Sequence, residues 1–467
     1  MSTTAQHVAT IADLDPASGE LLAEIPCAST MEVHAAVARA RAAQRSWAEL
    51  GVEARAAALS RFGERLAADA PSLGETVTRE MGKTLRSAVG EVKGYASGVS
   101  AEAQEVVEAL APITYGDGAS GGGANNVTTV HEPLGVVAAI TPWNFPVGMP
   151  LSIITPALVA GNAVVFKPSE HTPLTGARLA ELLQAELPEG VLELVQGDGT
   201  TGAALVEAEV DMVGFVGSRA TGQRIMNAAA GSLKRLVLEL GGKDPLVVFE
   251  DADLGAAARC AVEHSLRNTG QVCCSIERVY VADAIAEEFE AEVVRLAGEW
   301  THGDGREDGV KMGPLVSEGQ RAKVVAQVRA AVEEGANLRV GGVQPDGPGW
   351  FYPATVLTGV EQGHRITHEE TFGPVVAVTR FDGSEDEGVR FANDTVYGLG
   401  ANVWTGDPAR GVRVAARLRA GQVGVNRYLG GASGSPWVGA RQSGFGHLGG
   451  PDGHRQFTVP KTISIGR

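Results

Sequence analysis

The sequence predicts an α/β fold in which two parallel-sheet domains are joined to a small β arm. The chain has 467 residues, enough for about three domains of roughly 150 residues each. Short apolar runs suited to buried parallel strands alternate with helical segments. Hydrophobic residues make up 44% and charged residues 20%, a composition that excludes disordered, collagen-like and coiled-coil classes.

The first segment, residues 29–110, is rich in Ala, Glu and Arg at helical spacing and predicts several surface helices. Ser29 and Glu32 stand in capping-box positions at its start. Three residues that commonly interrupt helices divide the segment: Gly51, Pro71 and Gly82.

The next segment, residues 114–133, begins with glycine-rich turns and becomes β-branched at Val127–Val130. We predict a projecting arm that ends in a strand, and a plain flexible linker is the alternative. The tail, residues 457–466, alternates like an edge strand that can pair with another chain.

Five short apolar runs follow the arm and predict the strands of one sheet: 135–140, 162–166, 191–195, 210–216 and 236–240. Helical patterns at 176–187 and 221–230 are the crossovers. Such alternation predicts a doubly wound, Rossmann-like sheet that binds its ligand beyond the carboxyl ends of the strands.

A second alternating block runs from 245 to about 444, with strands at 246–249, 278–282, 375–381 and 401–405 and long helices around Glu287 and Ala326. The two blocks meet near 240–242. We therefore predict a cofactor domain from 1–112 and 134–240, a catalytic domain from 241–445, and an arm and tail at 113–133 and 456–467.

Charge and cysteine content narrow the possible partners and the compartment. The net charge of −17 repels nucleic acid and anionic lipid, so a small molecule is the expected partner. Four cysteines form no disulfide framework and no zinc spacing, so we expect no metal and a reducing compartment. The first residues show no secretory signal, so we expect a cytoplasmic protein.

One uncharged stretch, residues 134–166, is long enough to span a membrane. Four prolines interrupt it: Pro142, Pro146, Pro150 and Pro156. We therefore predict a buried strand–loop–helix–strand passage rather than a membrane helix.

Two strand ends carry residues suited to a nucleotide. The segment Gly217–Gly222 follows a strand and begins a helix, so its backbone N–H groups can face a phosphate. An ordinary strand-to-helix turn would have the same pattern. Lys167 and Glu170 follow another strand, where a carboxylate would bind ribose hydroxyls and repel a 2′-phosphate. Glu170 therefore favours NAD over NADP as the cofactor. The alternative is that Lys167 and Glu170 are only a solvated pair of charges.

Three residues can support nucleophilic catalysis. Cys273 ends a helical pattern beside Gly270, and a buried structural cysteine is the usual alternative. Glu239 ends an apolar strand, where burial would raise its pKa and suit it to general-base work. Asn144 lies in a proline-rich loop and can donate an amide N–H to an oxyanion.

Taken in order, six motifs resemble those of the NAD(P)-dependent aldehyde dehydrogenase superfamily, of the hydrolytic, non-acylating type. They cover nearly the whole chain: Pro142-Trp143-Asn144-Phe145-Pro146, Lys167-Pro168-Ser169-Glu170, Gly217-Ser218, Glu239-Leu240-Gly241-Gly242-Lys243, Gly270-Gln271-Val272-Cys273 and Glu370-Thr371-Phe372-Gly373-Pro374.

The resemblance implies a catalytic role for each matching residue. Cys273 is the nucleophile, Asn144 and the Cys273 N–H hold the oxyanion, and Glu239 activates water for thioester hydrolysis. Lys167 is implied both in the catalytic set and at the adenosine ribose.

The same resemblance implies a cofactor site. Glu170 contacts the adenosine ribose, Ser218 the pyrophosphate, Glu370 the nicotinamide ribose, and Phe372 flanks the nicotinamide. The remaining cofactor residues are Pro142, Trp143, Gly217, Thr221, Leu240 and Gly241.

The substrate pocket is expected from position relative to the motifs, from Phe145, Met149, Ser152, Arg267, Val272, Cys274, Arg427 and Trp437. Arg267 stands six residues before Cys273, where succinate-semialdehyde dehydrogenases also place an arginine. Those enzymes usually carry a second arginine where this chain has Ser152. Either Arg427 takes the place of that missing arginine, or Arg267 and Arg427 both have structural roles. Phe145 and Trp437 favour an apolar aldehyde.

Some family members carry a further glutamate near the C-terminus, where this chain reads Gly446-His447-Leu448. A structural or surface role is therefore expected for His447, and a place in the pocket wall for Cys274. Two alternatives to a hydrolytic enzyme remain: a CoA-acylating dehydrogenase, against which Glu239 argues, and a non-catalytic protein that reuses the fold. A homodimer or homotetramer is expected from the family.

Overall fold

The first sheet of the protein is doubly wound. The computed structural model describes residues 9–115, 126–430, 432 and 434–465. Five parallel strands form this sheet in the order β7-β6-β5-β8-β9, which is third-second-first-fourth-fifth along the chain. Their bounds are β5 Val136–Ile140, β6 Ala163–Lys167, β7 Leu192–Leu194, β8 Met212–Val216 and β9 Arg235–Glu239. The five predicted strands and the Rossmann-like order are confirmed.

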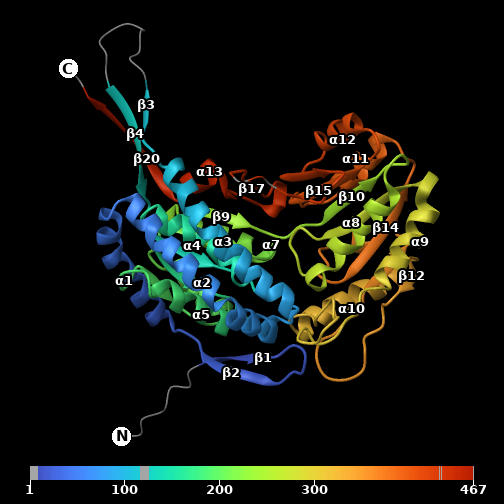
Figure 1. The fold of residues 1–467 in the computed structure, drawn as a ribbon, viewed down its shortest axis with the longest axis horizontal. Helices are drawn as coiled ribbons and strands as arrows, with labels where there is room; N and C mark the ends of the chain where they lie inside the picture. Colours follow the sequence, from blue (N-terminus) through green and yellow to red (C-terminus); the bar gives the residue numbers. More distant parts are fainter. Residues whose placement is uncertain (1–8, 116–125, 431, 433, 466–467) are drawn as a thin grey trace.

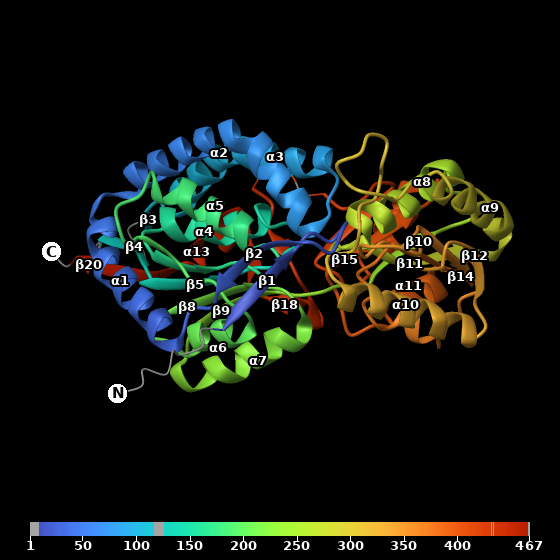
Figure 2. The same ribbon diagram turned by 90° about the horizontal axis from the view of Figure 1, so that it is seen from below.

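Alternate residues of β5 face two different apolar layers. Val137 and Ala139 pack in a cluster with the buried sides of α2, α3, α4 and α5, whereas Val136 and Ala138 pack with α1, α6 and α7. Figure 2 shows α2, α3 and α5 on one side of this sheet and α6 and α7 on the other. Burial on both faces explains why these strands read as continuous apolar runs.

The helices of this half begin and end largely where the residues predict. They are α1 Thr30–Glu49, α2 Val52–Met81, α3 Leu85–Ala109, α4 Gly148–Val159, α5 Pro173–Gln184, α6 Gly199–Glu207 and α7 Arg219–Ala229. Ser29 and Glu32 form both halves of the capping box, and Gly82 ends α2 in a left-handed conformation. Pro71 does not interrupt α2, because Leu66, Leu73 and Val77 on either side are fully buried and packing holds the helix together.

The uncharged stretch 134–166 folds as β5, a loop, α4 and β6, as predicted. Pro150 and Pro156 lie inside α4, which has 12 residues. Across the described ranges, no helix combines the length and the apolar character that a membrane span requires.

The second sheet has seven strands in the order β12-β13-β14-β11-β10-β15-β16. Its strands are β10 Asp244–Val248, β11 Ile276–Ala282, β12 Asn337–Val340, β13 Thr355–Thr358, β14 Val375–Phe381, β15 Gly400–Trp404 and β16 Gln422–Val425. Its helices are α8 Leu254–Leu266, α9 Ala286–Ala297, α10 Glu318–Glu333, α11 Glu385–Asn393 and α12 Pro408–Ala415. The sequence predicted four of these strands and missed β12, β13 and β16, which have only four residues each.

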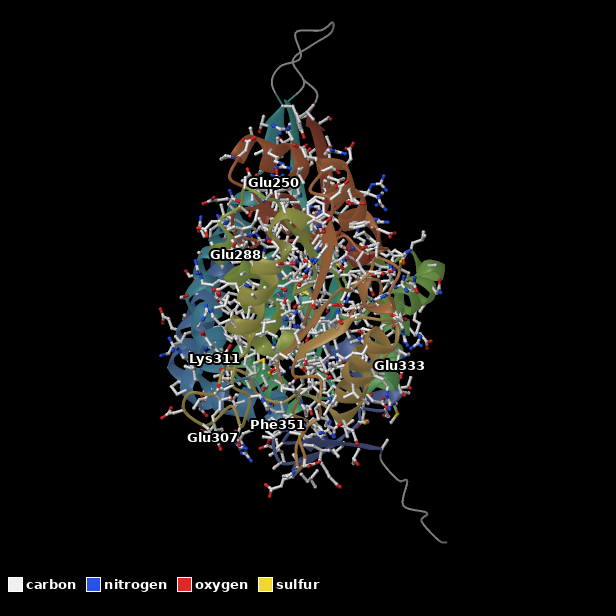
Figure 3. The ribbon with its side chains drawn as sticks, turned by 90° about the vertical axis from the view of Figure 1, so that its right-hand side faces the viewer. Glu250, Glu288, Glu307, Lys311, Glu333 and Phe351 are labelled. Atoms are coloured by element: carbon white, nitrogen blue, oxygen red, sulfur yellow. The ribbon has the colours of Figure 1, made fainter. Side chains whose placement is uncertain are left out.

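The chain passes from the first sheet to the second directly after β9. β9 ends at Glu239 in the first sheet, and β10 begins at Asp244 in the second. A later strand, β18 (Gly444–Phe445), returns to pair antiparallel with β9. Figure 1 shows the two halves of the molecule side by side. Figure 3 shows the outer end of the second half, where the labelled glutamates, among them Glu288 and Glu333, are exposed.

A three-stranded sheet projects from the first half (Figure 1). It consists of β3 Ile113–Tyr115, β4 Asn126–Pro133 and β20 Thr458–Ile465, in the order β20-β4-β3. The predicted tail strand is therefore an edge strand, paired with β4 of its own chain from Thr458 to Ile465. The glycine cluster at 121–123 lies outside the described residues.

Smaller elements complete the chain. A hairpin of β1 Thr10–Leu14 and β2 Leu21–Pro26 precedes α1. Near the C-terminus, β17 Trp437–Val438 pairs with β19 His447–Leu448, and α13 Gly450–Arg455 leads into β20.

Candidate active site

Two adjoining cavities lie at the carboxyl ends of β5, β8 and β9. The first has a volume of about 200 Å³ and the second about 480 Å³, and both are bounded by Pro142, Trp143, Gly217 and Ser218. The first brings together predicted residues that are far apart in sequence: Asn144, Met149, Glu239, Leu240, Gly241, Cys273, Glu370 and Phe372. The second contains Lys167, Glu170 and Thr221.

The loop that carries Cys273 has an unusual backbone. Asn268, Thr269 and Gly270 all have positive φ, at 54°, 58° and 70°. A Cβ on Gly270 would lie 2.0 Å from the carbonyl oxygen of Gly373, so this position admits only glycine. The loop before Cys273 is thereby packed directly against the loop that contains Phe372.

Asn144 is held against the same loop. The Asn144 side-chain Nδ2 donates to the backbone carbonyl oxygen of Gln271 at 3.0 Å. The backbone carbonyl oxygen of Asn144 accepts from Asn268 Nδ2 at 3.2 Å. Asn144 is buried. An amide nitrogen has two hydrogens, so one remains for a ligand in the cavity.

Cys273 and Cys274 form a coupled pair of thiols. Their mutual hydrogen bond, followed by burial, raises the pKa of Cys273 well above its usual range. The same hydrogen bond lowers the pKa of Cys274 to about 7, and the Tyr428 hydroxyl donates to Cys274 Sγ at 3.1 Å. The hydrogen bond therefore favours ionisation of Cys274 over that of Cys273.

Glu239 is buried beside Cys273. Burial raises the pKa of its carboxyl group well above the usual range, and a hydrogen bond with Trp437 partly opposes this shift. Among the described residues, its Oε1 has no hydrogen-bond partner. A buried carboxyl group with a free oxygen and a raised pKa holds a proton more readily than an exposed one.

Glu370 lies directly over the two glycines that follow β9. Its Oε1 accepts from the Gly242 N–H at 3.1 Å, and a Cβ on Gly241 would lie 2.2 Å from the same oxygen. Burial raises the pKa of Glu370 to about 7. Glycine at 241 therefore leaves the space that the carboxylate occupies.

A buried ion pair that the sequence analysis missed fixes the segment after Glu370. Glu277 accepts backbone hydrogen bonds from Thr371 at 2.7 Å and Phe372 at 2.8 Å. Lys243 Nζ lies 2.6 Å from the Glu277 carboxylate and also donates to Thr371 Oγ1 at 3.0 Å. The Phe372 ring then meets Trp143 edge-to-face, with ring centroids 5.5 Å apart.

The larger cavity begins at two strand ends. Ser218 caps α7, and its Oγ accepts from the Thr221 N–H at 3.3 Å. Lys167 is buried, with Nζ 3.8 Å from the Glu170 carboxylate, and burial lowers the pKa of Lys167. Glu170 remains partly exposed at the cavity wall.

A second missed pair supports the Asn144 loop from α3. Glu91 Oε1 accepts from the N–H groups of Val147 and Gly148, each at 3.1 Å. Its other oxygen is bonded to the buried Lys83 ammonium, which also lies 4.0 Å from the centroid of the Phe145 ring. No local sequence signal marks either residue, because their partners lie in another element.

The predicted substrate residues fall in three places. Phe145, Val272, Cys274 and Trp437 belong to one apolar cluster beside Cys273, together with Leu399 and Leu429. Met149 lines the first cavity and Ser152 lines a further one along α3. Arg267 and Arg427 instead lie around Tyr428, and both are exposed. The Arg267 guanidinium is 5.7 Å from the centroid of the Tyr428 ring. Arg427 Nε donates to the backbone carbonyl oxygen of Tyr428 at 3.4 Å.

One further predicted residue, His447, has structural surroundings. His447 lies in β19, where its backbone is hydrogen-bonded to the Gln456 side chain. Across the described ranges, no group of three His, Cys, Asp or Glu side chains is arranged to hold a metal ion.

Comparison with known proteins identifies the family. The model of the aldehyde dehydrogenase family matches residues 3–463, and the chain belongs to this family. It is 37% identical to a probable NADP-dependent succinate-semialdehyde dehydrogenase of Sinorhizobium fredii, over 97% of this chain and 92% of that relative. It is also 37% identical to a betaine aldehyde dehydrogenase of Bacillus subtilis, over 96% and 93% of the two chains.

A solved structure confirms the fold class. Lactaldehyde dehydrogenase from Escherichia coli superposes with a TM-score of 0.94 at 32% identity, over 99% of this chain and 97% of that one. The predicted family and α/β fold are therefore correct. The chain is an aldehyde-oxidising oxidoreductase by family.

Proposed function

We propose that the chain oxidises an aldehyde to a carboxylic acid with NAD and without CoA. The observation that carries this proposal is the convergence of Cys273, Asn144, Glu239 and Glu370 on one cavity of about 200 Å³. Each supplies a different requirement of the reaction: a nucleophile, an oxyanion donor, a base and a cofactor contact.

In the first step, the Cys273 sulfur bonds to the aldehyde carbon, and the carbonyl electron pair moves onto oxygen. The remaining N–H of the Asn144 amide and the Cys273 backbone N–H donate to that oxygen. The pKa of Cys273 is raised, so the thiol must lose its proton as it attacks, and Glu239 in the same cavity is the acceptor. Removal of the substrate hydride then leaves a thioester on Cys273.

Before the second step, Glu239 releases to solvent the proton that it took from Cys273. It then removes a proton from water, which attacks the thioester carbon; the carboxylic acid leaves, and the Cys273 thiolate takes the proton back from Glu239. Its raised pKa suits this transfer, because a base is most effective when its pKa approaches the working pH. The CoA-acylating alternative would replace this water by a thiol and would not need Glu239.

The residues of the two cavities fit a dinucleotide. Ser218 and the first turn of α7 present N–H groups for a pyrophosphate, and Lys167 and Glu170 lie where a ribose would be held. Glu370 and Phe372 line the smaller cavity at the nicotinamide end. When bound there, the nicotinamide supplies the hydride acceptor.

We propose NAD rather than NADP because Glu170 is a partly exposed carboxylate at the wall of the larger cavity. A carboxylate accepts hydrogen bonds from a ribose 2′-hydroxyl and repels a 2′-phosphate. Replacement Glu170→Gln should raise kcat/KM for NADP relative to NAD by about tenfold. Equal use of both cofactors by the unaltered protein would overturn the preference.

The direct test is NADH formation, followed at 340 nm with an aldehyde and NAD in the absence of CoA. We expect Cys273→Ala to abolish turnover while NAD still binds, as measured by quenching of tryptophan fluorescence. Turnover retained by that variant contradicts the mechanism. Turnover that requires CoA favours the acylating alternative, and NAD binding without turnover favours a non-catalytic role.

We further propose a cytoplasmic homodimer or homotetramer. The free edge of β20 and the projecting sheet of β3, β4 and β20 offer backbone groups to a second subunit. Sedimentation of the full chain tests this assembly.

A further inference from the structure

Arg219 is the first residue of α7 and directly follows Ser218, which lines both cavities of the proposed dinucleotide site. Its side chain contacts two segments that are far away in the sequence. Arg219 Nη1 donates to Gln442 Oε1 at 2.5 Å, and its Cζ lies 5.7 Å from the centroid of the Tyr397 ring. A guanidinium within about 6 Å of a ring centroid is attracted to the face of that ring. Arg219 itself lines neither cavity, so it acts from outside the site.

Gln442 belongs to a segment that is attached to the nicotinamide end of the site. The next residue, Ser443, is fully buried. Its Oγ donates to the Gly241 carbonyl oxygen at 2.7 Å, and its carbonyl oxygen accepts from the Leu240 N–H at 2.9 Å. Leu240 and Gly241 both line the smaller cavity. Gln442 is therefore one residue away from the contacts that hold this end of the site.

Tyr397 is attached to the same contacts from the second half of the molecule. It lies between α11 and β15 and is 9% exposed. The next residue, Gly398, donates its N–H to Ser443 Oγ at 2.9 Å. The Tyr397 carbonyl oxygen also accepts from Arg441 Nη1 at 3.3 Å. Both contacts of Arg219 thus lead to one buried hydroxyl group, that of Ser443.

The two ends of the proposed dinucleotide site are carried by different elements. Ser218, at the pyrophosphate end, caps α7, whereas Gly241, at the nicotinamide end, follows β9. One dinucleotide can contact both ends only if their separation is fixed, and small displacements of positioning groups weaken such binding. Arg219 connects α7 with the segment that holds Gly241, so it can fix this separation.

We propose that Arg219 is a positioning residue for the cofactor, which holds the pyrophosphate end of the site against the nicotinamide end through Gln442 and Tyr397. This inference rests on the proposed function and adds to it a residue outside the six motifs. Loss of the connection should loosen the bound dinucleotide, so the reduced cofactor should leave faster. The chemistry at Cys273 should not be affected, because Arg219 does not line its cavity.

The experiment measures the dissociation of NADH from the full chain by stopped flow, as the fall of NADH fluorescence when the complex is mixed with excess NAD. Arg219→Gln should raise the dissociation rate constant and the KM for NAD by about fivefold, because one hydrogen bond and one ring contact are lost. Hydride transfer in the first turnover at saturating NAD should be unchanged. Arg219→Lys keeps a cation beside the ring and should recover part of the loss. The matched control is Arg45→Gln, an exposed arginine of α1 paired with Glu49, which should change neither value.

A second variant separates positioning from direct attraction of the cofactor phosphates. Gln442→Ala changes no charge, yet it should also raise the dissociation rate constant, and combining it with Arg219→Gln should add little further. If Gln442→Ala has no effect and the loss in Arg219→Gln disappears at high salt, Arg219 attracts the phosphates directly. That result overturns the inference, and so do strictly additive effects of the two substitutions.

Failure of the inference and failure of the proposed function give different results. Unchanged NADH dissociation in Arg219→Gln overturns the inference and leaves the proposed function standing. Dissociation is measured without aldehyde, so a protein that binds NADH but oxidises no aldehyde overturns the proposed catalysis while the role of Arg219 is still judged. If the unaltered protein binds neither NADH nor NADPH, the dinucleotide site is absent and both proposals are overturned.

Discussion

Lys243 and Glu277 form a buried ion pair, with Nζ and Oε2 2.6 Å apart, that anchors the segment carrying Glu370 and Phe372. Both side chains are almost fully buried. A buried pair of this kind contributes little net stability, but removal of one partner leaves an unpaired charge in the interior. The pair therefore fixes a geometry rather than adding stability.

Replacement Glu277→Gln should lower the free energy of unfolding by about 3 kcal/mol, because Lys243 loses its counter-charge. It should also raise the KM for NAD, because Phe372 loses one of its fixing hydrogen bonds. Urea unfolding and steady-state kinetics measure the two effects. Glu369→Gln, in an exposed pair with Arg365, is the control and should change neither.

The Glu91–Lys83 pair should matter for catalysis through the Asn144 loop. Glu91→Gln should lower kcat about tenfold, because Val147 and Gly148 lose a charged acceptor and the oxyanion donor shifts. Lys83→Met combined with Glu91→Gln removes both charges and should be more stable than Glu91→Gln alone. Strict additivity in this double-mutant cycle would show that the two residues act independently.

Hydrolysis should depend on pH through Glu239. Burial raises the pKa of this carboxyl group, so its basic form appears only as pH rises through the raised value. We expect the deacylation rate to increase with pH as this carboxyl group ionises. Glu239→Gln should lower the steady rate of NADH formation by about a hundredfold, because Glu239 accepts the proton of Cys273 in the first step and that of water in the second. A pH-independent rate in the unaltered protein would argue against Glu239 as the base.

The same carboxyl group should affect stability. Its pKa is higher in the folded protein than in the unfolded chain, so folding favours its protonated form. Its contribution is complete at low pH and is lost as pH rises through the folded value. Glu239→Gln should therefore flatten the fall of unfolding free energy as pH rises above the ordinary carboxyl pKa, as measured by urea unfolding over a series of pH values.

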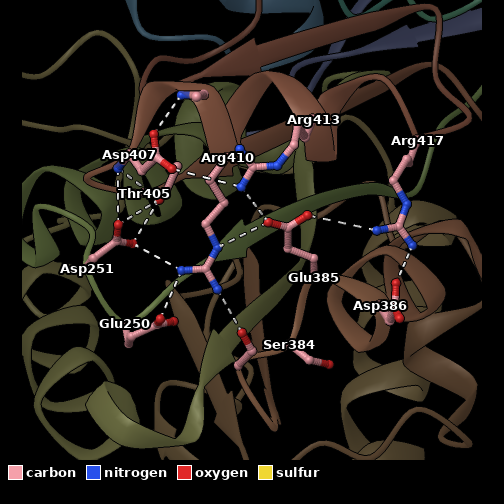
Figure 4. Close-up of polar contacts among 12 residues, drawn as sticks. Glu250, Asp251, Ser384, Glu385, Asp386, Thr405, Asp407, Arg410, Arg413 and Arg417 are labelled. Atoms are coloured by element: carbon pink, nitrogen blue, oxygen red, sulfur yellow. Dashed lines mark hydrogen bonds and ion pairs between the residues drawn. The ribbon is translucent and has the colours of Figure 1, made fainter.

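Arg410 should stabilise the second half without affecting catalysis. Figure 4 shows its guanidinium among Glu250, Asp251 and Glu385, and it also lies 3.9 Å from the centroid of the Phe249 ring. Arg410→Gln should lower the free energy of unfolding by about 1–2 kcal/mol, because a charged contact and a ring contact are lost together. Activity should be unchanged. Arg329→Gln, in an exposed pair within α10, should show no loss of stability.

The sequence predicted best the buried strands of five or more residues, and it missed the four-residue strand β13 although that strand is fully buried. β5, β6 and β8 are buried at every position and were found from their apolar runs. β12 is largely exposed and short, so it leaves no such pattern, and it was missed. Pro71 was expected to interrupt a helix, but α2 continues through it because its buried side chains hold the helix together.

The sequence by itself determined the family and the alternation of strands and helices, and it predicted the residues of the candidate site, because these depend on residue type and order along the chain. The tertiary structure decided what supports that site. Glu277 lies 94 positions from Thr371, and Glu91 lies 56 from Val147. The cavity along α3 that Ser152 lines likewise forms only because α13 and the segment before it fold back against α3. Contacts between distant segments leave no local pattern, so only the folded chain shows which buried charges meet and which face a cavity.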